Sequence, residues 1–174
     1  MKKIKAKILV SSLSMLTLTA PASADPVADF YKGKAITMLV ASGVGGGYDT
    51  YARVFARFAV KYIPGNPNII AKNMPAAGGL AAASTLYNNV DRDGLNIGAF
   101  ANVSTLDPLF GNPGARYDPR KFGWIGSIGK LQNVCATWHT SPVKTIDDAK
   151  KRDIIVAGAG AASNTAVVPR IVNE

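Results

Sequence analysis

The sequence predicts an α/β fold built on a parallel sheet. Short apolar runs alternate with segments whose apolar residues recur at helical spacing; the runs are residues 34–41, 68–72 and 95–100, and the helical segments are 49–62 and 80–90. Strands and helices that alternate in this way form βαβ units with parallel strands and right-handed crossovers. The junctions that follow the strands are rich in glycine and small polar residues. We therefore expect loops of similar character at one edge of the sheet.

The first 24 residues are typical of a secretory signal peptide. Four lysines precede an apolar stretch over residues 8–20, and Ala22-Ser23-Ala24 matches the small-residue pattern of a cleavage site. A membrane anchor is the alternative, but serines and threonines dilute the stretch, which is shorter than the roughly 20 apolar residues that a spanning helix needs. We expect an exported chain that begins near Asp25.

Length and charge narrow the class of protein. Without residues 1–24 the chain has about 150 residues, the size of one ordinary domain. It then carries 16 basic and 11 acidic residues, a net charge of +5 in place of the +9 of the whole sequence. The basic residues form no cluster with interleaved aromatics, so nucleic-acid binding is not indicated. The mild positive excess slightly favours small anions as ligands.

The first half reads as strand, helix, strand, helix, strand. Residues 34–41 are apolar and β-rich, as in a strand buried on both faces. The helix over 49–62 is amphipathic, since its large apolar residues share one side and its basic residues another; these are Tyr51, Phe55, Phe58 and Tyr62, against Arg53, Arg57 and Lys61. Residues 63–67 have turn chemistry and end this helix. The helix over 80–90 places Ala83, Leu86, Tyr87 and Val90 on one side.

The second half has a looser pattern. Residues 107–122, rich in proline, glycine and aspartate, read as a connection that leaves the first sheet. Thr145 to Asp148 resemble a capping box that opens a short helix to about residue 151. Another helix begins near Thr165 and is still running at residue 174, so we expect a longer protein that has been cut. Three further strands are predicted, at 124–128, 134–138 and 154–157. We assign 25–106 to a first lobe and 107–174 to part of a second.

The stretch VASGVGGGYD, residues 40–49, joins the first strand to the first helix. It lacks the spacing of a dinucleotide loop, and no lysine follows it as in a phosphate loop. Glycines let backbone N–H groups converge on an anion, and the next helix adds partial positive charge. We expect a side chain at the middle glycine, Gly46, either to block the approach of the anion or to forbid a required positive φ. The alternative is that the glycines only make a tight turn.

Loops of the same kind recur at four junctions. They are residues 43–49, 76–79, 102–105 and 158–164. Junctions that follow parallel strands lie at the carboxyl ends of the strands, where ligands bind. Two lobes that face each other with such loops would enclose a small anion.

Residues for catalysis or metal binding are scarce. His139 is the only histidine, and no G-x-S-x-G elbow is present. We interpret His139 as a surface residue. Cys135 is read as a small buried side chain, or else as half of a disulfide whose partner is absent. One histidine and one cysteine do not make a catalytic zinc site without clustered carboxylates.

Four segments resemble the extracytoplasmic solute receptors of tripartite tricarboxylate transporters, the Bug family. They are DFYKGKAITMLVASGVGGGYDTYARVFARF, IPGNPNIIAKNMPAAGG, YDPRKFGWIGSI and SPVKTIDDAK, and the resemblance runs from about Asp29 to the end. It implies an α/β, two-lobed, type II-like periplasmic binding protein with parallel-rich sheets, incomplete in this chain. Such a receptor captures a dicarboxylate, tricarboxylate or aromatic carboxylate and delivers it to the membrane permease subunits. It is a monomer, needs no cofactor and is not an enzyme.

The resemblance also implies ligand-binding residues. Main-chain amides and bridging waters of two loops would hold the carboxylate, and two further loops would shape the cleft. The implied residues are Gly45, Gly46, Gly47 and Asp49; Ala77, Gly78 and Gly79; Ser104 and Thr105; and Gly160, Ala161, Ser163 and Asn164. Many family members have proline before the glycines, where this chain has Val44. A secreted α/β enzyme with its catalytic residues in a missing C-terminal half is the alternative function.

Overall fold

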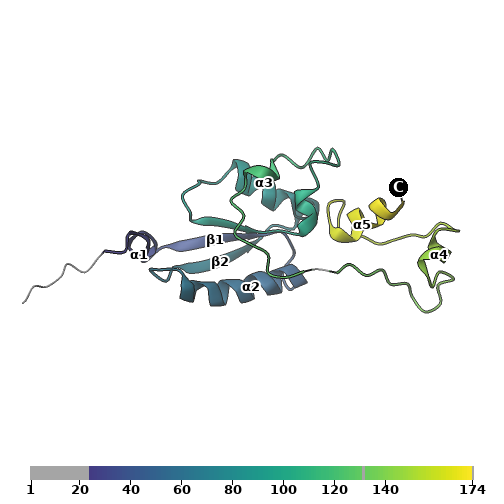
Figure 1. The fold of residues 1–174 in the computed structure, drawn as a ribbon, viewed down its shortest axis with the longest axis horizontal. Coiled ribbons are helices and arrows are strands. Elements are labelled where there is room, and N and C mark those ends of the chain that lie inside the picture. The colour runs from purple at the N-terminus through teal and green to yellow at the C-terminus, as the bar shows by residue number, and fades with distance from the viewer. Residues whose placement is uncertain (1–23, 131, 174) are drawn as a thin grey trace, which may run out of the picture.

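Over residues 24–130 and 132–173 the protein is an α/β fold whose three strands form one parallel sheet in the order β2-β1-β3 (Figure 1). The computed structural model describes residues 24–130 and 132–173, so the predicted signal peptide lies almost wholly outside the described residues. The strands are β1 (Ala35–Val40), β2 (Asn68–Asn73) and β3 (Asn96–Ala99). The predicted parallel α/β arrangement of the first half is confirmed, with each strand within two residues of its expected bounds.

Helices cover both faces of the sheet, α2 on one and α3 on the other (Figure 1). The α-helices are α1 (Pro26–Tyr31), α2 (Gly47–Ala59), α3 (Leu80–Asn88), α4 (Ile146–Ala149) and α5 (Asn164–Asn173). The 3-10 turns are η1 (Val60–Tyr62), η2 (Ala76–Gly79), η3 (Asn102–Thr105) and η4 (Pro119–Lys121). The sequence reading missed α1, although Asp25 caps it and Pro26 stands at its first position, a combination typical of a helix start.

The central strand β1 sets the position of its two neighbours. Its residues pair in register with β2 from Ala35↔Asn68 to Val40↔Asn73. They pair with β3 from Thr37↔Asn96 to Val40↔Ala99. Because all three strands run the same way and end at the same level, the loops after them start from one edge of the sheet.

The core follows the alternation of β1. Met38 and Val40 pack against Ala52 and Ala56 of α2, with parts of β2 and β3 around them. Leu39, on the opposite face, packs against α3. Successive side chains of a strand point to opposite faces, so a strand between two helix layers is apolar throughout. The position of β1 between two helix layers explains the apolar character of residues 34–41, the pattern that predicted a strand buried on both faces.

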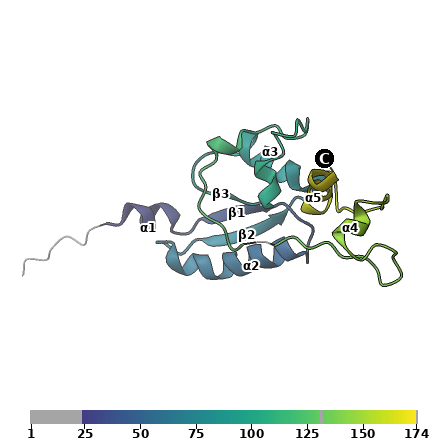
Figure 2. The ribbon, with the colours of Figure 1, turned by 45° about the vertical axis from the view of Figure 1, so that its right-hand side comes forward.

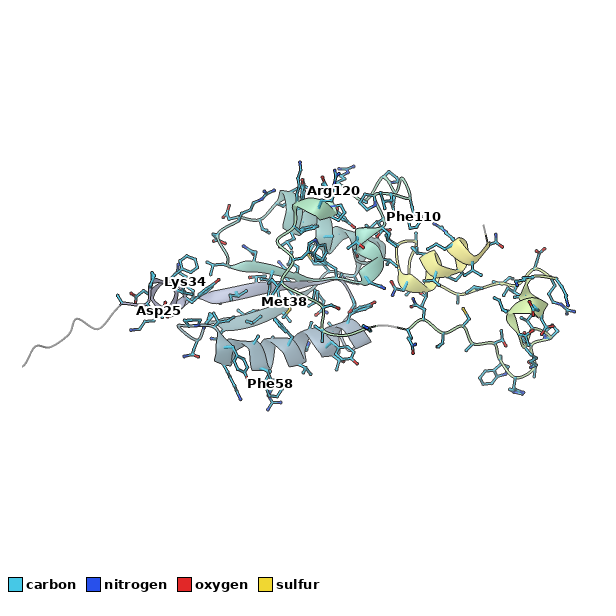
Figure 3. All side chains as sticks on the ribbon, in the orientation of Figure 1. Asp25, Lys34, Met38, Phe58, Phe110 and Arg120 are labelled. Carbon is cyan, nitrogen blue, oxygen red and sulfur yellow. The ribbon has the colours of Figure 1, made fainter. Side chains whose placement is uncertain are left out.

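Helix α2 presents an unexpected side to the sheet. Its buried residues are Asp49, Ala52 and Ala56, which recur every three or four positions. Phe55 is partly buried at the edge of this contact. Phe58 is 52% exposed and points away from the sheet (Figure 3). The amphipathic helix is therefore confirmed, but its aromatic stripe is not its core face, because the small side chains and the buried Asp49 meet the sheet.

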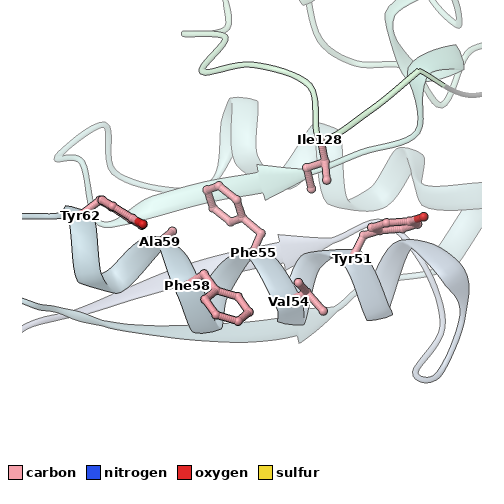
Figure 4. Close-up of a pocket in the computed structure, with 7 residues that line it drawn as sticks. All are labelled: Tyr51, Val54, Phe55, Phe58, Ala59, Tyr62 and Ile128. Carbon is pink, nitrogen blue, oxygen red and sulfur yellow. The ribbon is translucent and has the colours of Figure 1, made fainter.

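The aromatic side of α2 borders a shallow groove of about 280 Å³. Its lining is apolar or aromatic and comes, apart from Ile128, from α2 and η1 (Figure 4). Tyr62, at one end, is 85% exposed. The groove is the flank of one helix, and it offers little to orient a small anion.

Residues 107–122 fold back onto α3. Tyr117 is buried with Leu80 and Ala83, and the ring of Phe122 lies 5.6 Å from that of Tyr87. Asn88 and Ser84 of α3 also donate hydrogen bonds to carbonyl groups of residues 116 and 114. This segment therefore covers the outer side of α3, and the expectation that it leaves the first sheet is wrong. The assignment of 107–174 to a second lobe stays a prediction.

The strands predicted at 124–128, 134–138 and 154–157 are wrong for the described residues. These segments have no regular secondary structure, and none of them pairs with a strand. Their apolar side chains are exposed, as at Trp138 (75%). A strand needs a neighbour for its backbone N–H and C=O groups, and the chain here runs out to α4 and back (Figure 1). Strand propensity identified these segments, but it does not show whether a neighbouring strand is present to pair with them.

The helix starts of the second half are confirmed. Thr145 caps α4, and the Asp148 carboxylate closes the capping box from the third helical position. Helix α5 begins at Asn164, one residue before the expected start. In the part of the chain that the structure describes, no helix is long and apolar enough to cross a membrane.

We expect Gly79→Ala to destabilise the fold by roughly 2–5 kcal/mol. Gly79 has a φ of +100°, and an added Cβ would lie 2.7 Å from the Cβ of Ala41 and 2.8 Å from its carbonyl oxygen. Gly47→Ala is the matched control, because no atom lies within 4 Å of a Cβ there. Urea denaturation followed by circular dichroism measures both; equal stability of the two variants would contradict the strain at Gly79.

Candidate functional site

The loop between β1 and α2 is held by hydrogen bonds of the chain itself. Gly45 has a φ of +79°, and its N–H donates to the Asp49 carboxylate at 2.9 Å. Gly46 has a φ of −70°, and its N–H donates to the Gly43 carbonyl at 3.2 Å. Of the two effects expected at Gly46, the required positive φ is therefore wrong, because the turn reverses at Gly45. Two of the three predicted glycine amides are used within the loop.

Asp49 anchors this loop and is only 2% exposed. Its carboxylate accepts hydrogen bonds from Arg53 Nε at 3.0 Å, from Gly45 N at 2.9 Å and from Asn73 Nδ2 at 2.8 Å. Asn73 also donates to the Ser42 carbonyl at 2.9 Å and accepts from Arg53 at 3.0 Å. The network ties the end of β1, the start of α2 and the end of β2 into one unit.

The same donors keep Asp49 ionised. The Arg53 side chain, followed by the Gly45 N–H and the Asn73 amide, lowers the pKa of Asp49 from its ordinary 3.8 to about 2, although burial acts in the opposite direction. The charge stands in the first turn of α2, where the helix dipole also favours it. Because protein donors occupy both oxygens, Asp49 supports the loop in this geometry.

The first turn of α2 leaves N–H groups without acceptors. A helix cannot use its first N–H groups internally, and in the described residues nothing accepts from Gly47 N or Tyr48 N. Both groups stand at the end of the helix that carries partial positive charge. This turn is therefore suited to a small anion in a way that Gly45 and Gly46 are not.

The loop before α5 lies directly on the loop that follows β2. A Cβ on Gly78 would come within 2.8 Å of the Ser163 nitrogen, and one on Gly160 within 3.2 Å of the Gly78 Cα. Ala77 and Gly78 both adopt positive φ, which lets η2 turn at this contact. Figures 1 and 2 both place α5 beyond the arrowheads of β1 and β2. Predicted residues from two distant junctions are thus brought together.

In the loop after β3, Ser104 and Thr105 were expected to shape the ligand cleft, but their hydrogen bonds lie within the fold. Ser104 is buried, and its carbonyl accepts a 2.7 Å hydrogen bond from Tyr117. The Thr105 hydroxyl donates to the Asn102 carbonyl at 2.8 Å, within the same turn. These two hydroxyl-bearing residues therefore stabilise the loop. The exposed residue that reaches another junction is Asn102.

Asn164, the first residue of α5, joins three of the four junctions. Its Nδ2 donates to Asn102 Oδ1 at 2.8 Å and to the Tyr48 hydroxyl at 3.2 Å. Its Oδ1 is buried and meets no donor among the described residues. Beneath these polar contacts, Tyr48 packs on a small apolar cluster of Ala101, Val103 and Val167.

A second carboxyl lies just behind η3. Asp107 is 2% exposed, and burial raises its pKa. Burial and the Asp107 charge together raise the pKa of Tyr117 to about 12. Both side chains lie inside the fold, so we infer that they stabilise η3 and do not contact a ligand.

The structure brings together most of the predicted residues but gives several of them supporting roles. Gly79 is buried against β1, Ser163 donates to the Gly160 carbonyl at 2.8 Å, and Ala161 is exposed. The sequence reading missed four residues of the cluster: Tyr48, Arg53, Asn73 and Asn102. Two of them carried a usable signal, since Arg53 follows Asp49 by four residues on a helix and Asn73 closes the second strand.

The residues weighed for other chemistry lie in the second half of the chain. His139 is exposed, as expected, whereas Cys135 is also exposed, so its interpretation as a buried side chain is wrong. Within residues 24–130 and 132–173, no three His, Cys, Asp or Glu side chains gather as a metal site would require. Comparisons of this chain with family models, with curated proteins and with solved structures gave no match.

We expect the stabilising effect of Asp49 to depend on pH. Because the pKa of Asp49 is lower in the folded chain than its ordinary 3.8, its ionised form stabilises the fold above about pH 4, and this contribution is lost as the pH falls towards about 2. Asp49→Asn should therefore be less stable than wild type at pH 7, and the difference should shrink between pH 4 and pH 2.

Urea denaturation at a series of pH values measures this difference. Asp147→Asn is the matched control, since its ion pair with Lys150 leaves both side chains 70% exposed and an exposed pair contributes little. A difference for Asp49→Asn that stays constant from pH 7 to pH 2 would argue against an ionised anchor.

Proposed function

We propose that this chain is the ligand-binding part of an exported receptor that captures a small carboxylate and passes it to membrane permease subunits. The observation that carries the proposal is the meeting of the four small-residue junctions at the carboxyl end of the sheet. Asn164 bonds to Tyr48 and Asn102, and the backbones of Gly78 and Gly160 are in contact. Ligands of parallel α/β folds bind at this edge.

The chemistry of the cluster favours an anion held by neutral donors. Gly47 N and Tyr48 N are unused N–H groups at the positive end of a 13-residue helix. The nearby carboxylate of Asp49 is neutralised by Arg53 at 3.0 Å, so it does not repel a second anion strongly. A carboxylate can accept hydrogen bonds from such N–H groups without a salt bridge.

Export, two lobes and delivery to a permease rest on the sequence motifs. Residues 1–24 have the composition of a signal peptide, and the four motif segments resemble the Bug-family receptors. In this proposal the β1–α2 loop belongs to one lobe and the loop before α5 to the other. The carboxylate lies between them, and the receptor works as a periplasmic monomer without a cofactor.

We expect Gly47→Val to weaken carboxylate binding while leaving the fold intact. A Cβ at Gly47 meets no atom within 4 Å, whereas one at Gly46 would lie 3.3 Å from the Gly43 carbonyl oxygen and press on the turn. A branched side chain at Gly47 would obstruct the approach to the unused N–H groups. The loss of one hydrogen bond to a charged group is worth about 1.5–3 kcal/mol, or roughly 10- to 150-fold in Kd.

Calorimetric titration with citrate, succinate and benzoate measures the effect, after a thermal-shift screen has shown which of them binds. Gly43→Val is the matched control, because it lies in the same loop and a Cβ there also meets no atom within 4 Å. Equal affinity of wild type and Gly47→Val would place the carboxylate away from α2. A wild-type chain that binds none of the three would refute the receptor proposal.

A further inference from the structure

The hydrogen bonds around Asn164 fix the orientation of its amide group. Asn102 Oδ1 accepts from Val103 N at 3.0 Å, so this atom must be the oxygen of the Asn102 side chain. It lies 2.8 Å from the Asn164 amide, which must therefore turn its nitrogen towards Asn102, because two carbonyl oxygens would repel at that distance. The orientation follows from the partners on both sides.

This orientation determines what the Tyr48 hydroxyl can do. The second N–H of Asn164 Nδ2 donates to Tyr48 Oη at 3.2 Å, so the phenol oxygen acts as an acceptor in this contact. Its own proton remains available, because the only hydrogen bond of the Tyr48 hydroxyl within the described residues is the one that its oxygen accepts from Asn164. The ring is half-buried and packs on Ala101, Val103 and Val167, which holds the hydroxyl in place at the junctions.

We propose that the Tyr48 hydroxyl is a specificity-determining donor of the site, directed by Asn164, and that it selects an anionic oxygen over a neutral amide. This inference rests on the proposed function, because it takes the junction cluster as the binding site. The phenol O–H would donate to a carboxylate oxygen of the guest while its oxygen continues to accept from Asn164. Asn164 acts through Tyr48 and is a positioning residue.

The protonation state of Tyr48 is compatible with this role. Burial raises the pKa of Tyr48 above its ordinary 10.0, and the hydrogen bond from Asn164 opposes the rise only in part. The phenol therefore keeps its proton throughout the physiological range. Benzoate affinity should stay constant from pH 6 to pH 9, because neither Tyr48 nor a simple monocarboxylate titrates there.

The first test removes only the hydroxyl. Tyr48→Phe keeps the ring in its apolar cluster, and Tyr51→Phe, one turn along α2 and 58% exposed, is the matched control. Calorimetric titration with citrate, succinate and benzoate should give about a tenfold or larger rise in Kd for Tyr48→Phe and no change for Tyr51→Phe. The preference of wild type for benzoate over benzamide should also fall in Tyr48→Phe.

The second test follows the Tyr48 hydroxyl without any carboxylate. In chains labelled with fluorotyrosine, the fluorine resonance of Tyr48, assigned by its loss in Tyr48→Phe, reports the pKa of the phenol. Asn164→Asp removes the donor and places a negative charge beside Tyr48, so this pKa should rise. Kd for the three carboxylates should rise in the same variant.

The outcomes separate the two proposals. Wild-type binding that Tyr48→Phe leaves unchanged would overturn the role of Tyr48 and leave the receptor function standing. An unchanged or lower phenol pKa in Asn164→Asp would overturn the orientation by Asn164. A wild-type chain that binds none of the three carboxylates would refute the proposed function and this inference with it.

Discussion

The parallel pairing of β1 with strands on both sides is the constraint on which the other features depend. Because β1 ends level with β2 and β3, the three loops that follow start from one edge of the sheet. The interior position of β1 also explains its apolar side chains on both faces, which α2 and α3 cover. An antiparallel neighbour would send one of these loops to the opposite edge. The junction cluster is thus a consequence of strand direction before any side chain contributes to it.

Charge and small side chains then fix the loops at that edge. A flexible glycine loop loses much conformational entropy when it is ordered, and the Asp49 carboxylate offsets part of this loss with donors from three elements. The same buried carboxylate lies on the side of α2 from which Ala52 and Ala56 meet the sheet. The loop before α5 is placed by close backbone contact at Gly78 and by the burial of Ala162 beside Leu80. Asn164 then orients this loop, because its amide donates hydrogen bonds to Tyr48 and Asn102 of two other junctions.

The sequence was sufficient for features that depend on local patterns. The strand at 34–41, the glycine-rich junctions and the Thr145 capping box carry their own signals, and the structure has all three. The sequence was insufficient for features that depend on a contact with a residue far away in the chain. Helical spacing groups Tyr51 with Phe58, but only the contact at Asp49 tells which side of α2 is buried. The segment at 134–138 has strand propensity and no strand beside it. Tyr48 was missed because its partner, Asn164, lies 116 residues away.

We propose that junctions from four parts of the chain form one anion-binding site. Amide NMR spectra recorded during titration with succinate, and with succinamide as the neutral control, test it most directly. We expect saturable shifts with succinate at Gly47, Tyr48, Asn102 and Asn164, and weak or no shifts with succinamide. Residues of the apolar groove, such as Val54 and Phe58, should not respond. Shifts that centre on the groove, or that are equal for the two compounds, would contradict the claim.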